Sequence, residues 1–174
     1  MKEYTMNKVF FCPTTVLCLA QFIGIIGSAF ISGAIMSLSA HTIPALKAPK
    51  ISTPDTAARF RTLLFAVRRT LPFIAILPTA SFAFLAWKAP DAKMAHSIAA
   101  VCSAGFIPYT LLFMMRTCRA ILSKAEVLES KSRGPESSEG ENLEVLLNRW
   151  EMMNYTRGVL PLVGALVGLS AVLL

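Results

Sequence analysis

The stretch VLCLAQFIGIIGSAFISGAIMSLS, Val16 to Ser39, contains no Asp, Glu, Lys or Arg. Three more uncharged stretches follow it, Leu71 to Trp87, Ala95 to Met115 and Gly158 to Leu174. At about 1.5 Å of rise per residue, helices of roughly 17 to 24 residues reach about 25 to 36 Å, enough to cross a hydrocarbon core of about 30 Å. The pattern predicts an all-α fold, a four-helix transmembrane bundle with spans at about 16–39, 71–87, 95–115 and 158–174.

Composition favours a membrane protein over a soluble bundle. Hydrophobic residues make up 55% of the chain and charged residues 16%, below the quarter or so that soluble domains carry, and the mean hydropathy is +0.58. A soluble four-helix bundle needs a polar face on each helix, and these stretches are apolar nearly all round. The length predicts a single membrane domain, 1–174, with a flexible cytosolic linker at about 130–140, where the sequence reads SKSRGPESSEG.

Basic residues fall mainly on one side of the predicted membrane. Thirteen Lys and Arg residues lie in the first and third loops, and four lie in the N-terminal segment and the second loop. The positive-inside rule then places the first and third loops in the cytosol and both termini in the lumen or outside. This topology and contact with anionic lipid account for the net charge of +7, so nucleic acid is not an expected partner. We expect an integral membrane protein of the endoplasmic reticulum or a related endomembrane.

The loops contain further predicted helices. In the first loop, Ile43 to Thr70, the first half is expected to be irregular because it holds three prolines, Pro44, Pro49 and Pro54. The second half, Thr56 to Arg69, reads as a basic amphipathic helix leading into the second span. In the third loop, Cys118 to Glu129 and Glu141 to Arg157 are predicted to be helical on either side of the linker.

The familiar signatures of cofactor sites are missing. The four cysteines, of which most lie in or beside spans, show no CxxC spacing and read as buried free thiols. The two histidines, His41 and His96, are predicted at opposite ends of the bundle, and no HExxH, CxxCH, GxGxxG or GxxxxGK[ST] motif occurs. These absences disfavour a metal, haem, flavin or nucleotide enzyme. The lack of Asp, Glu, Lys and Arg within the spans also disfavours an ion-coupled transporter.

One group of polar residues stands just before the fourth span. Trp150, Asn154 and Arg157 fall at i, i+4 and i+7, on one face of a helix that Leu143 and Leu147 extend. On composition alone they read as an interfacial anchor, with the indole at the lipid headgroups and the guanidinium reaching toward water. A functional interpretation instead requires all three to face a common pocket.

Three segments resemble the fungal anthrone oxygenase family, small four-span membrane proteins of polyketide gene clusters. They are SGAIMSLSAHTIPAL (Ser32 to Leu46), GFIPYTLLFMMRTCRAILSKAE (Gly105 to Glu126) and LLNRWEMMNYTRGVLPLVGALVGL (Leu146 to Leu169). The most specific pieces are IPYT followed by LFM, and the segment from Trp150 to Arg157 followed by LPL. The second span matches mainly in hydropathy.

The resemblance implies oxidation of a polyketide anthrone to an anthraquinone with O2 as co-substrate and with no metal or other cofactor. It suggests a catalytic group of Arg157, Asn154, His41 and Tyr109, and a substrate-binding pair of Trp150 and Thr110. The family pattern has a histidine four residues after the tryptophan, where this chain has Asn154, which cannot accept a proton as a base. Either His41 at the same membrane face serves instead, or the reaction depends on substrate acidity and electrostatics, or this member is altered.

Two other classes of function stay open at this level. A non-catalytic scaffold would tether pathway enzymes, for which the acidic segment Glu136 to Glu144 would suit docking. A small transporter for a hydrophobic polyketide product would need a homodimer, which Gly164 and Gly168 at GxxxG spacing permit.

Overall fold

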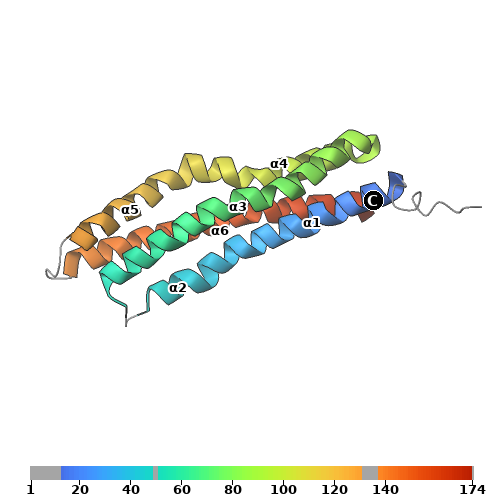
Figure 1. The fold of residues 1–174 in the computed structure, drawn as a ribbon. Helices are drawn as coiled ribbons and strands as arrows, with labels where there is room; N and C mark the ends of the chain where they lie inside the picture. Colours follow the sequence, from blue (N-terminus) through green and yellow to red (C-terminus); the bar gives the residue numbers. More distant parts are fainter. Residues whose placement is uncertain (1–12, 49–50, 131–136, 174) are drawn as a thin grey trace, which may run out of the picture.

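The computed structural model describes residues 13–48, 51–130 and 137–173, which form four long helical rods lying side by side (Figure 1). The first rod is α1 (Pro13–Ser37), the π-helix η2 (Leu38–Thr42) and α2 (Ile43–Leu46). The second is α3 (Thr53–Lys88), followed by a short 3-10 helix, η3 (Pro90–Ala92). The third is α4 (Lys93–Tyr109), the π-helix η4 (Thr110–Met114) and α5 (Met115–Ser130), and the fourth is α6 (Ser137–Leu173). The predicted all-α four-helix fold is confirmed.

Each rod contains one helix long and apolar enough to cross a membrane: Thr15–Leu46, Thr53–Lys88, Pro90–Leu128 and Leu143–Leu173. All four exceed the 20 or so residues that a bilayer requires. With 36 residues, α3 is about 54 Å long, so roughly 24 Å of it extends beyond a 30-Å hydrocarbon core. The helices predicted in the first and third loops are therefore continuations of the spans themselves.

The extension lies at the end of the bundle that carries the α2–α3 turn, the end of α5 and the start of α6, which we call the basic end (Figure 1). Large apolar side chains fill its interior, including Ile43, Phe60, Ile121, Leu147 and Trp150. Figure 1 places the C-terminus and the α3–α4 connection at the other end. The basic end is thus packed like a soluble bundle, around a core of its own.

A seven-residue repeat organises the inner face of α6. Its buried positions alternate by four and three residues: Leu143, Leu147, Trp150, Asn154, Arg157, Pro161, Gly164 and Gly168. This spacing is that of a left-handed coiled-coil seam. The repeat changes character along the helix, from large apolar residues at the basic end to glycine at the other end. Asn154 and Arg157 stand between the two kinds of packing.

The glycines at the far end allow close approach of helices within the bundle. A Cβ on Gly164 would lie 2.7 Å from Ser103 Oγ and 3.0 Å from the Ala99 carbonyl oxygen, and a Cβ on Gly168 would lie 2.5 Å from Phe82 Cε1. Such small residues are how membrane helices pack closely. The GxxxG pair therefore serves this chain's own bundle.

Apolar side chains point outward along the spans while small hydroxyls point inward. Phe73, Val101 and Leu112 are each more than two-thirds exposed, as side chains that face lipid are, whereas Ser28 and Ser103 are fully buried and 2.7 Å apart at their hydroxyl oxygens. Of the cysteines in the described residues, Cys118 is buried, Cys102 half-buried and Cys18 exposed. The prediction of buried thiols is confirmed for Cys118 and wrong for Cys18, which faces outward from α1.

The helices extend into two segments that are predicted to be irregular. The first loop was expected to be irregular from Ile43, yet the helix continues to Leu46. The π-turn of η2, in which the Ile43 amide donates to the Leu38 carbonyl five residues back, widens the helix just before Pro44 and accommodates the proline. The linker predicted at about 130–140 overlaps the described helices at its margins, since α5 ends at Ser130 and α6 begins at Ser137. Residues 131–136 of that linker lie outside the described residues.

The orientation of the bundle gives a testable prediction. Because the first and third predicted loops hold thirteen of the seventeen Lys and Arg residues, and the described helices that flank these loops meet at the basic end, we expect that end to face the cytosol. A protease site inserted between α5 and α6 should be cleaved by protease added to sealed microsomes, whose outer face is cytosolic. A tag at the C-terminus is the internal control and should be protected; the reverse pattern would refute the orientation.

Candidate active site

The three polar residues before the fourth span point into the bundle. Trp150 is 1% exposed, Asn154 0% and Arg157 5%. Interfacial anchors point outward to headgroups and water, so the anchor interpretation is wrong for these side chains. Since they occupy successive core positions of the seven-residue repeat on α6, an asparagine and an arginine stand where a structural seam would place apolar residues.

Two π-helices flank this part of α6, one on each neighbouring rod. η2 lies in the first rod beside Asn154, whose Nδ2 donates to the Ile35 carbonyl one turn before η2, at 2.7 Å. η4 begins at Thr110, whose hydroxyl accepts a hydrogen bond from Arg157 Nη1 at 3.2 Å. Single π-turns inside α-helices interrupt the regular pattern of backbone hydrogen bonds, and they occur frequently at functional sites. η2 thus meets Asn154 through Ser39, and η4 meets Arg157, one turn further along α6.

Arg157 is a buried cation with a single polar partner. Thr110 accepts from Nη1 and donates its own hydroxyl to the Phe106 carbonyl at 2.6 Å, which orients the guanidinium. Arg157 Nε and Nη2 have no hydrogen-bond partner, and no carboxylate in the described residues forms an ion pair with this side chain. Burying an uncompensated charge costs several kcal/mol. The site is therefore a positive, water-poor environment with two free donors.

Trp150 packs beneath the guanidinium. The carbon of the Arg157 guanidinium lies 5.9 Å from the centre of the indole, and the Phe60 ring meets the indole edge-on, with centroids 5.1 Å apart and an interplanar angle of 89°. The indole Nε1 is buried without a hydrogen-bond partner. A cation over an indole is favourable when both are desolvated, so Trp150 helps to hold Arg157 inside the bundle.

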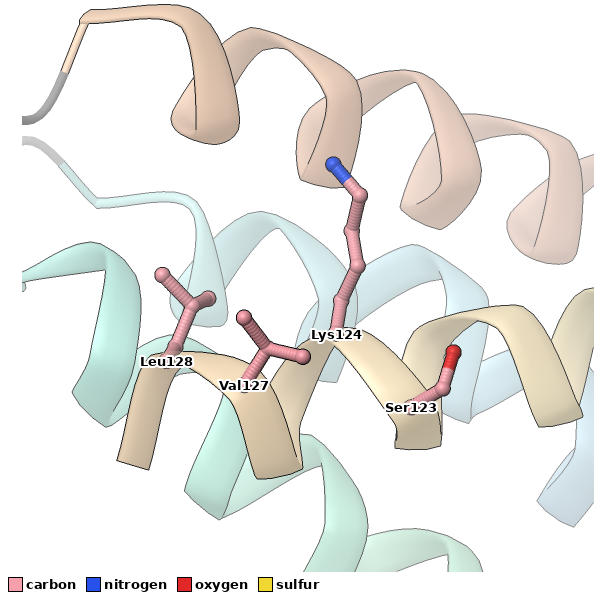
Figure 2. A pocket seen from close by; sticks show the side chains of 4 residues that line it. All are labelled: Ser123, Lys124, Val127 and Leu128. Carbon is pink, nitrogen blue, oxygen red and sulfur yellow. The ribbon is translucent and has the colours of Figure 1, made fainter. Parts of the chain in front are cut away.

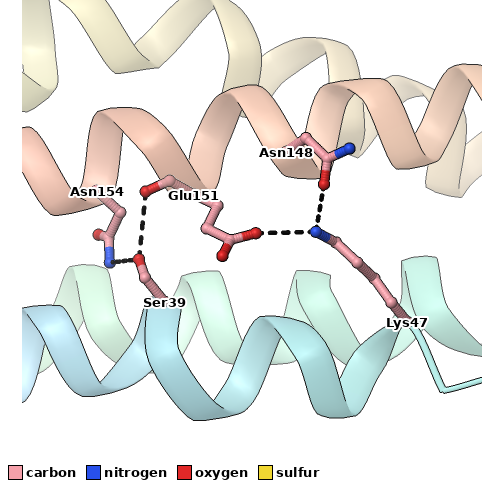
Figure 3. A network of polar contacts seen from close by, with 5 residues as sticks. All are labelled: Ser39, Lys47, Asn148, Glu151 and Asn154. Carbon is pink, nitrogen blue, oxygen red and sulfur yellow. Dashed lines mark hydrogen bonds and ion pairs between the residues drawn. The ribbon is translucent and has the colours of Figure 1, made fainter.

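Asn154 belongs to a network that ties α6 to the first rod (Figure 3). Its Nδ2 donates to Ser39 Oγ at 2.8 Å, and Ser39 Oγ donates in turn to the Glu151 carbonyl at 3.3 Å. Further along, Lys47 Nζ lies 2.8 Å from Glu151 Oε2 and also donates to Asn148 Oδ1. These contacts fix the register between the two rods at the level of the site.

The structure brings together four of the six candidate residues. Trp150, Asn154, Arg157 and Thr110 form one group, which we call the polar cluster. Tyr109 lies half-buried beside it, packed against the apolar core of the basic end and 5.1 Å from the Phe113 ring. His41 is exposed on the outside of η2 and does not join the cluster.

The second histidine is remote from the polar cluster. His96 is fully buried near the other end of the bundle, stacked on Phe82 with ring centroids 6.4 Å apart, and neither ring nitrogen has a hydrogen-bond partner. It precedes Thr110 by fourteen residues, or about 21 Å along the helix. No three His, Cys, Asp or Glu side chains gather into a metal-binding group within the part of the chain that the structure describes. The expected lack of a metal stays a prediction.

Sequence reasoning missed the contributions of the first rod and of Phe60. Ser39 and the Ile35 carbonyl hold the Asn154 amide, and neither residue type is a recognised signal by itself. Ser32 and Ser39 lie seven residues apart within an apolar span. This spacing is the one sequence feature that indicates a polar, buried face on the first rod.

The polar cluster is closed in this structure. Two hollows, of about 180 and 230 Å³, lie at the basic end and are smaller than the roughly 300 to 1,000 Å³ usual for ligand pockets. The first is lined by Ser123, Lys124, Val127 and Leu128 of α5 (Figure 2), and the second lies by the α2–α3 turn against the start of α6. Neither is lined by the polar cluster. Because Trp150, Asn154 and Arg157 are all buried, a ligand reaches them only when side chains or helices move.

The unpaired atoms of the polar cluster define what it can bind. Arg157 Nε, Arg157 Nη2 and Trp150 Nε1 are donors, and Asn154 Oδ1 is an acceptor. In a buried site of low dielectric constant, a cation with free N–H groups stabilises negative charge that develops on an oxygen far more than it does in water. The arrangement suits a flat apolar molecule with an oxygen that becomes anionic.

Comparison with known proteins identifies the family. A family model described as anthrone oxygenase matches residues 60–167, which run from within α3 to within α6 and include the whole polar cluster. The chain is 33% identical over 170 residues to anthrone oxygenase encC of Aspergillus fumigatus, covering 89% of this chain and 93% of that protein. It is 28% identical to anthrone oxygenase AgnL2 of Paecilomyces divaricatus (86% and 92% covered) and 26% identical to noranthrone monooxygenase of Aspergillus flavus (87% and 72% covered). No solved structure matches. The chain belongs to the anthrone oxygenase family.

Proposed function

We propose that this membrane protein is a monooxygenase that oxidises a polyketide anthrone to the anthraquinone with O2, without a metal or organic cofactor. The relatives named anthrone oxygenase and noranthrone monooxygenase support the reaction. The observation that carries the assignment to a site is Arg157, a buried guanidinium with free donors and no carboxylate partner among the described residues. An ionisable group inside a membrane bundle marks a functional site more often than a structural one.

The chemistry needs a stabilised anion more than a redox group. Loss of a proton from the methylene opposite the carbonyl gives an anthrolate, whose charge rests largely on the carbonyl oxygen. The electron-rich anthrolate passes one electron to O2, and the resulting radical and superoxide combine into a peroxide at the former methylene carbon. Loss of the second C–H proton and cleavage of the O–O bond then give the quinone and water. All four electrons that reduce O2 come from the substrate, so no external reductant is required.

Arg157 would hold the oxygen on which the anthrolate charge rests. Its guanidinium offers Nε and Nη2 side by side, and Thr110 fixes their direction through Nη1. Trp150 Nε1 supplies a further donor on the same face of α6. Because these groups are in place before the charge forms, they stabilise the anion without reorganisation. A cation at this position also makes the methylene more acidic, so that a weaker base can take its proton.

Neither the residue at the family's histidine position nor either histidine supplies a general base to the polar cluster. Asn154 cannot accept a proton, His41 points away and His96 lies about 21 Å along α4. We therefore favour deprotonation that depends on substrate acidity and on Arg157. The flat tricyclic ring would lie against the apolar side chains beside Trp150, with Tyr109 at the edge of the site.

The proposal is tested with membranes that contain the protein. Incubation with an anthrone under air should produce the quinone chromophore faster than membranes without the protein, and incubation under nitrogen should not. The rate should survive metal chelators and show no dependence on added flavin or nicotinamide. A rate equal to the spontaneous oxidation would refute the activity, and loss on chelation that one added metal restores would refute the cofactor-free mechanism.

The exposed position of His41 leads to a separate prediction. Replacing His41 with alanine should leave kcat within about twofold of the unmodified protein, because the ring does not reach the polar cluster. Initial rates of quinone formation measure this. A fall of a hundredfold, with unchanged thermal stability, would show that His41 is the base after all.

The proposal includes a location for the protein and a route for its substrate. Four helices long and apolar enough to span a bilayer fit an integral membrane protein, and we propose the endoplasmic reticulum or a related endomembrane as its location. A hydrophobic anthrone would then partition into the bilayer and reach the bundle from the side. Contact with other enzymes of the same polyketide pathway, or with a second copy, stays a prediction.

A further inference from the structure

The Asn154 amide is held in one orientation (Figure 3). The Ile35 carbonyl can only accept a hydrogen bond, so the amide group 2.7 Å from it must be the nitrogen. The same nitrogen donates to Ser39 Oγ at 2.8 Å, and Ser39 Oγ uses its proton on the Glu151 carbonyl. Both amide hydrogens of Asn154 are therefore engaged by the first rod, and Oδ1 is turned away from it.

Asn154 Oδ1 is a buried acceptor with no donor. The residue is 0% exposed, and Oδ1 makes no hydrogen bond. On the same face of α6 stand the unpaired donors of Trp150 and Arg157. The Arg157 guanidinium has free N–H groups, yet it is not bonded to this acceptor. Buried acceptors in native proteins nearly always find a partner, and one left open at a functional site is an expected place for a ligand.

A ligand with a negative charge alone cannot satisfy all the unpaired polar atoms of the polar cluster. An anionic oxygen can satisfy Arg157 and Trp150, but it would repel the lone pairs of Asn154 Oδ1. Satisfying all three side chains takes a molecule that carries an acceptor oxygen and, separately, a hydrogen-bond donor. On an aromatic ketone the simplest such donor is a ring hydroxyl.

We propose that Asn154 Oδ1 accepts a hydrogen bond from a ring hydroxyl of the substrate, and that Asn154 thereby selects hydroxylated anthrones. The inference rests on the proposed function and adds a specificity residue to it. A site built to pair with a substrate hydroxyl discriminates strongly against analogues that lack one, because its own polar group is then left unpaired. For one hydrogen bond we expect a preference of about 10- to 100-fold in kcat/KM.

The test compares substrates that differ in the donor alone. Anthrones with a single hydroxyl at each ring position are compared with their methyl ethers and with unsubstituted anthrone, after subtraction of spontaneous oxidation. The full-length protein in membranes should prefer the hydroxyl at one or more positions by about 10- to 100-fold. In Asn154→Ala that preference should shrink to about threefold or less.

Ser39→Ala is the matched control. It removes a hydrogen bond of the same inter-helix network but leaves Oδ1 in place, so it should keep the preference even if its overall rate falls. Asn154→Leu is the second variant. Leucine fills the space of asparagine but has no acceptor, so it shows whether an effect of Asn154→Ala comes from the lost acceptor or from the cavity that alanine leaves. It should also lose the preference.

The outcomes separate the two proposals. Oxidation of all the anthrones without a hydroxyl preference, or a preference that persists in both Asn154 variants, overturns the selection by Asn154 and leaves the proposed function standing. Loss of the preference in Ser39→Ala also overturns the selection by Asn154, because the hydroxyl preference would then depend on how the first rod packs and not on Oδ1. Oxidation of none of the anthrones overturns the proposed function, and this inference with it.

Discussion

Replacing Arg157 with methionine should lower kcat by about 10²- to 10³-fold while leaving the protein as stable as before or more so. The loss of rate is the usual effect of removing a donor to an oxyanion. The effect on stability has the opposite sign because the side chain is buried with two unpaired N–H groups and, among the described residues, no carboxylate partner. Replacing buried charge by a well-packed apolar group is often neutral or stabilising by about 1 to 4 kcal/mol. Quinone formation and thermal unfolding in detergent measure the two effects.

Arg157→Lys separates charge from geometry. Lysine keeps the positive charge but loses the planar fork that Thr110 orients. We therefore expect a kcat between those of the unmodified protein and of Arg157→Met, at least about tenfold below the unmodified protein. A lysine variant with full turnover would show that the charge alone is needed. A methionine variant that unfolds readily, with residual activity in proportion to the folded fraction, would mean that Arg157 serves structure and that the active-site assignment is wrong.

Most of the fold was accessible from the sequence because a membrane imposes one strong constraint. A bilayer core forces backbone hydrogen bonds to close within each helix, so four uncharged stretches such as Val16 to Ser39 leave few alternatives. The sequence does not predict where the first rod ends, because a proline lies near that end. Pro44 normally argues for an irregular segment, yet the helix continues past it to Leu46 by way of the π-turn at η2.

The site was predictable in part for a similar reason. The spacing of Trp150, Asn154 and Arg157 places them on one face of any helix, but it does not say whether that face is inside. The seven-residue repeat that continues to Gly164 and Gly168 decides this, since it runs along the packed seam of the bundle. The first-rod contacts of Asn154 depend on which rods are neighbours and at what register, and no local pattern encodes either.

His41 shows the limit of reasoning from residue type. A histidine at the expected end of the bundle is the natural choice of base at neutral pH. Its direction, however, depends on the rotation of the first rod, in which Ile35 and Ser39 face α6 and His41, two residues after Ser39, lies on another side. A single residue of displacement along a helix turns a side chain by about 100°, which is enough to remove a candidate from the site.

Trp150→Ala should cause the largest loss of stability, about 3 to 5 kcal/mol, which is the range for truncating a buried aromatic residue. The indole is 1% exposed, lies in the core of the basic end with Phe60 and Cys118, and fills the space directly below Arg157. The midpoint of thermal unfolding in detergent should fall clearly, and turnover should be lost with it.

Trp150→Phe distinguishes the two roles of this side chain. Phenylalanine keeps an aromatic ring against Phe60 but removes Nε1, which makes no well-formed hydrogen bond and has the Cys118 thiol, a weak acceptor, as its neighbour. Stability should therefore fall by only about 1.5 kcal/mol or less, as in other conservative core replacements. If Nε1 donates to the anthrolate, kcat should nevertheless fall by about 10- to 100-fold, as for a hydrogen bond to a charged group. Unchanged turnover in the phenylalanine variant would confine Trp150 to packing and leave Arg157 alone to hold the anion.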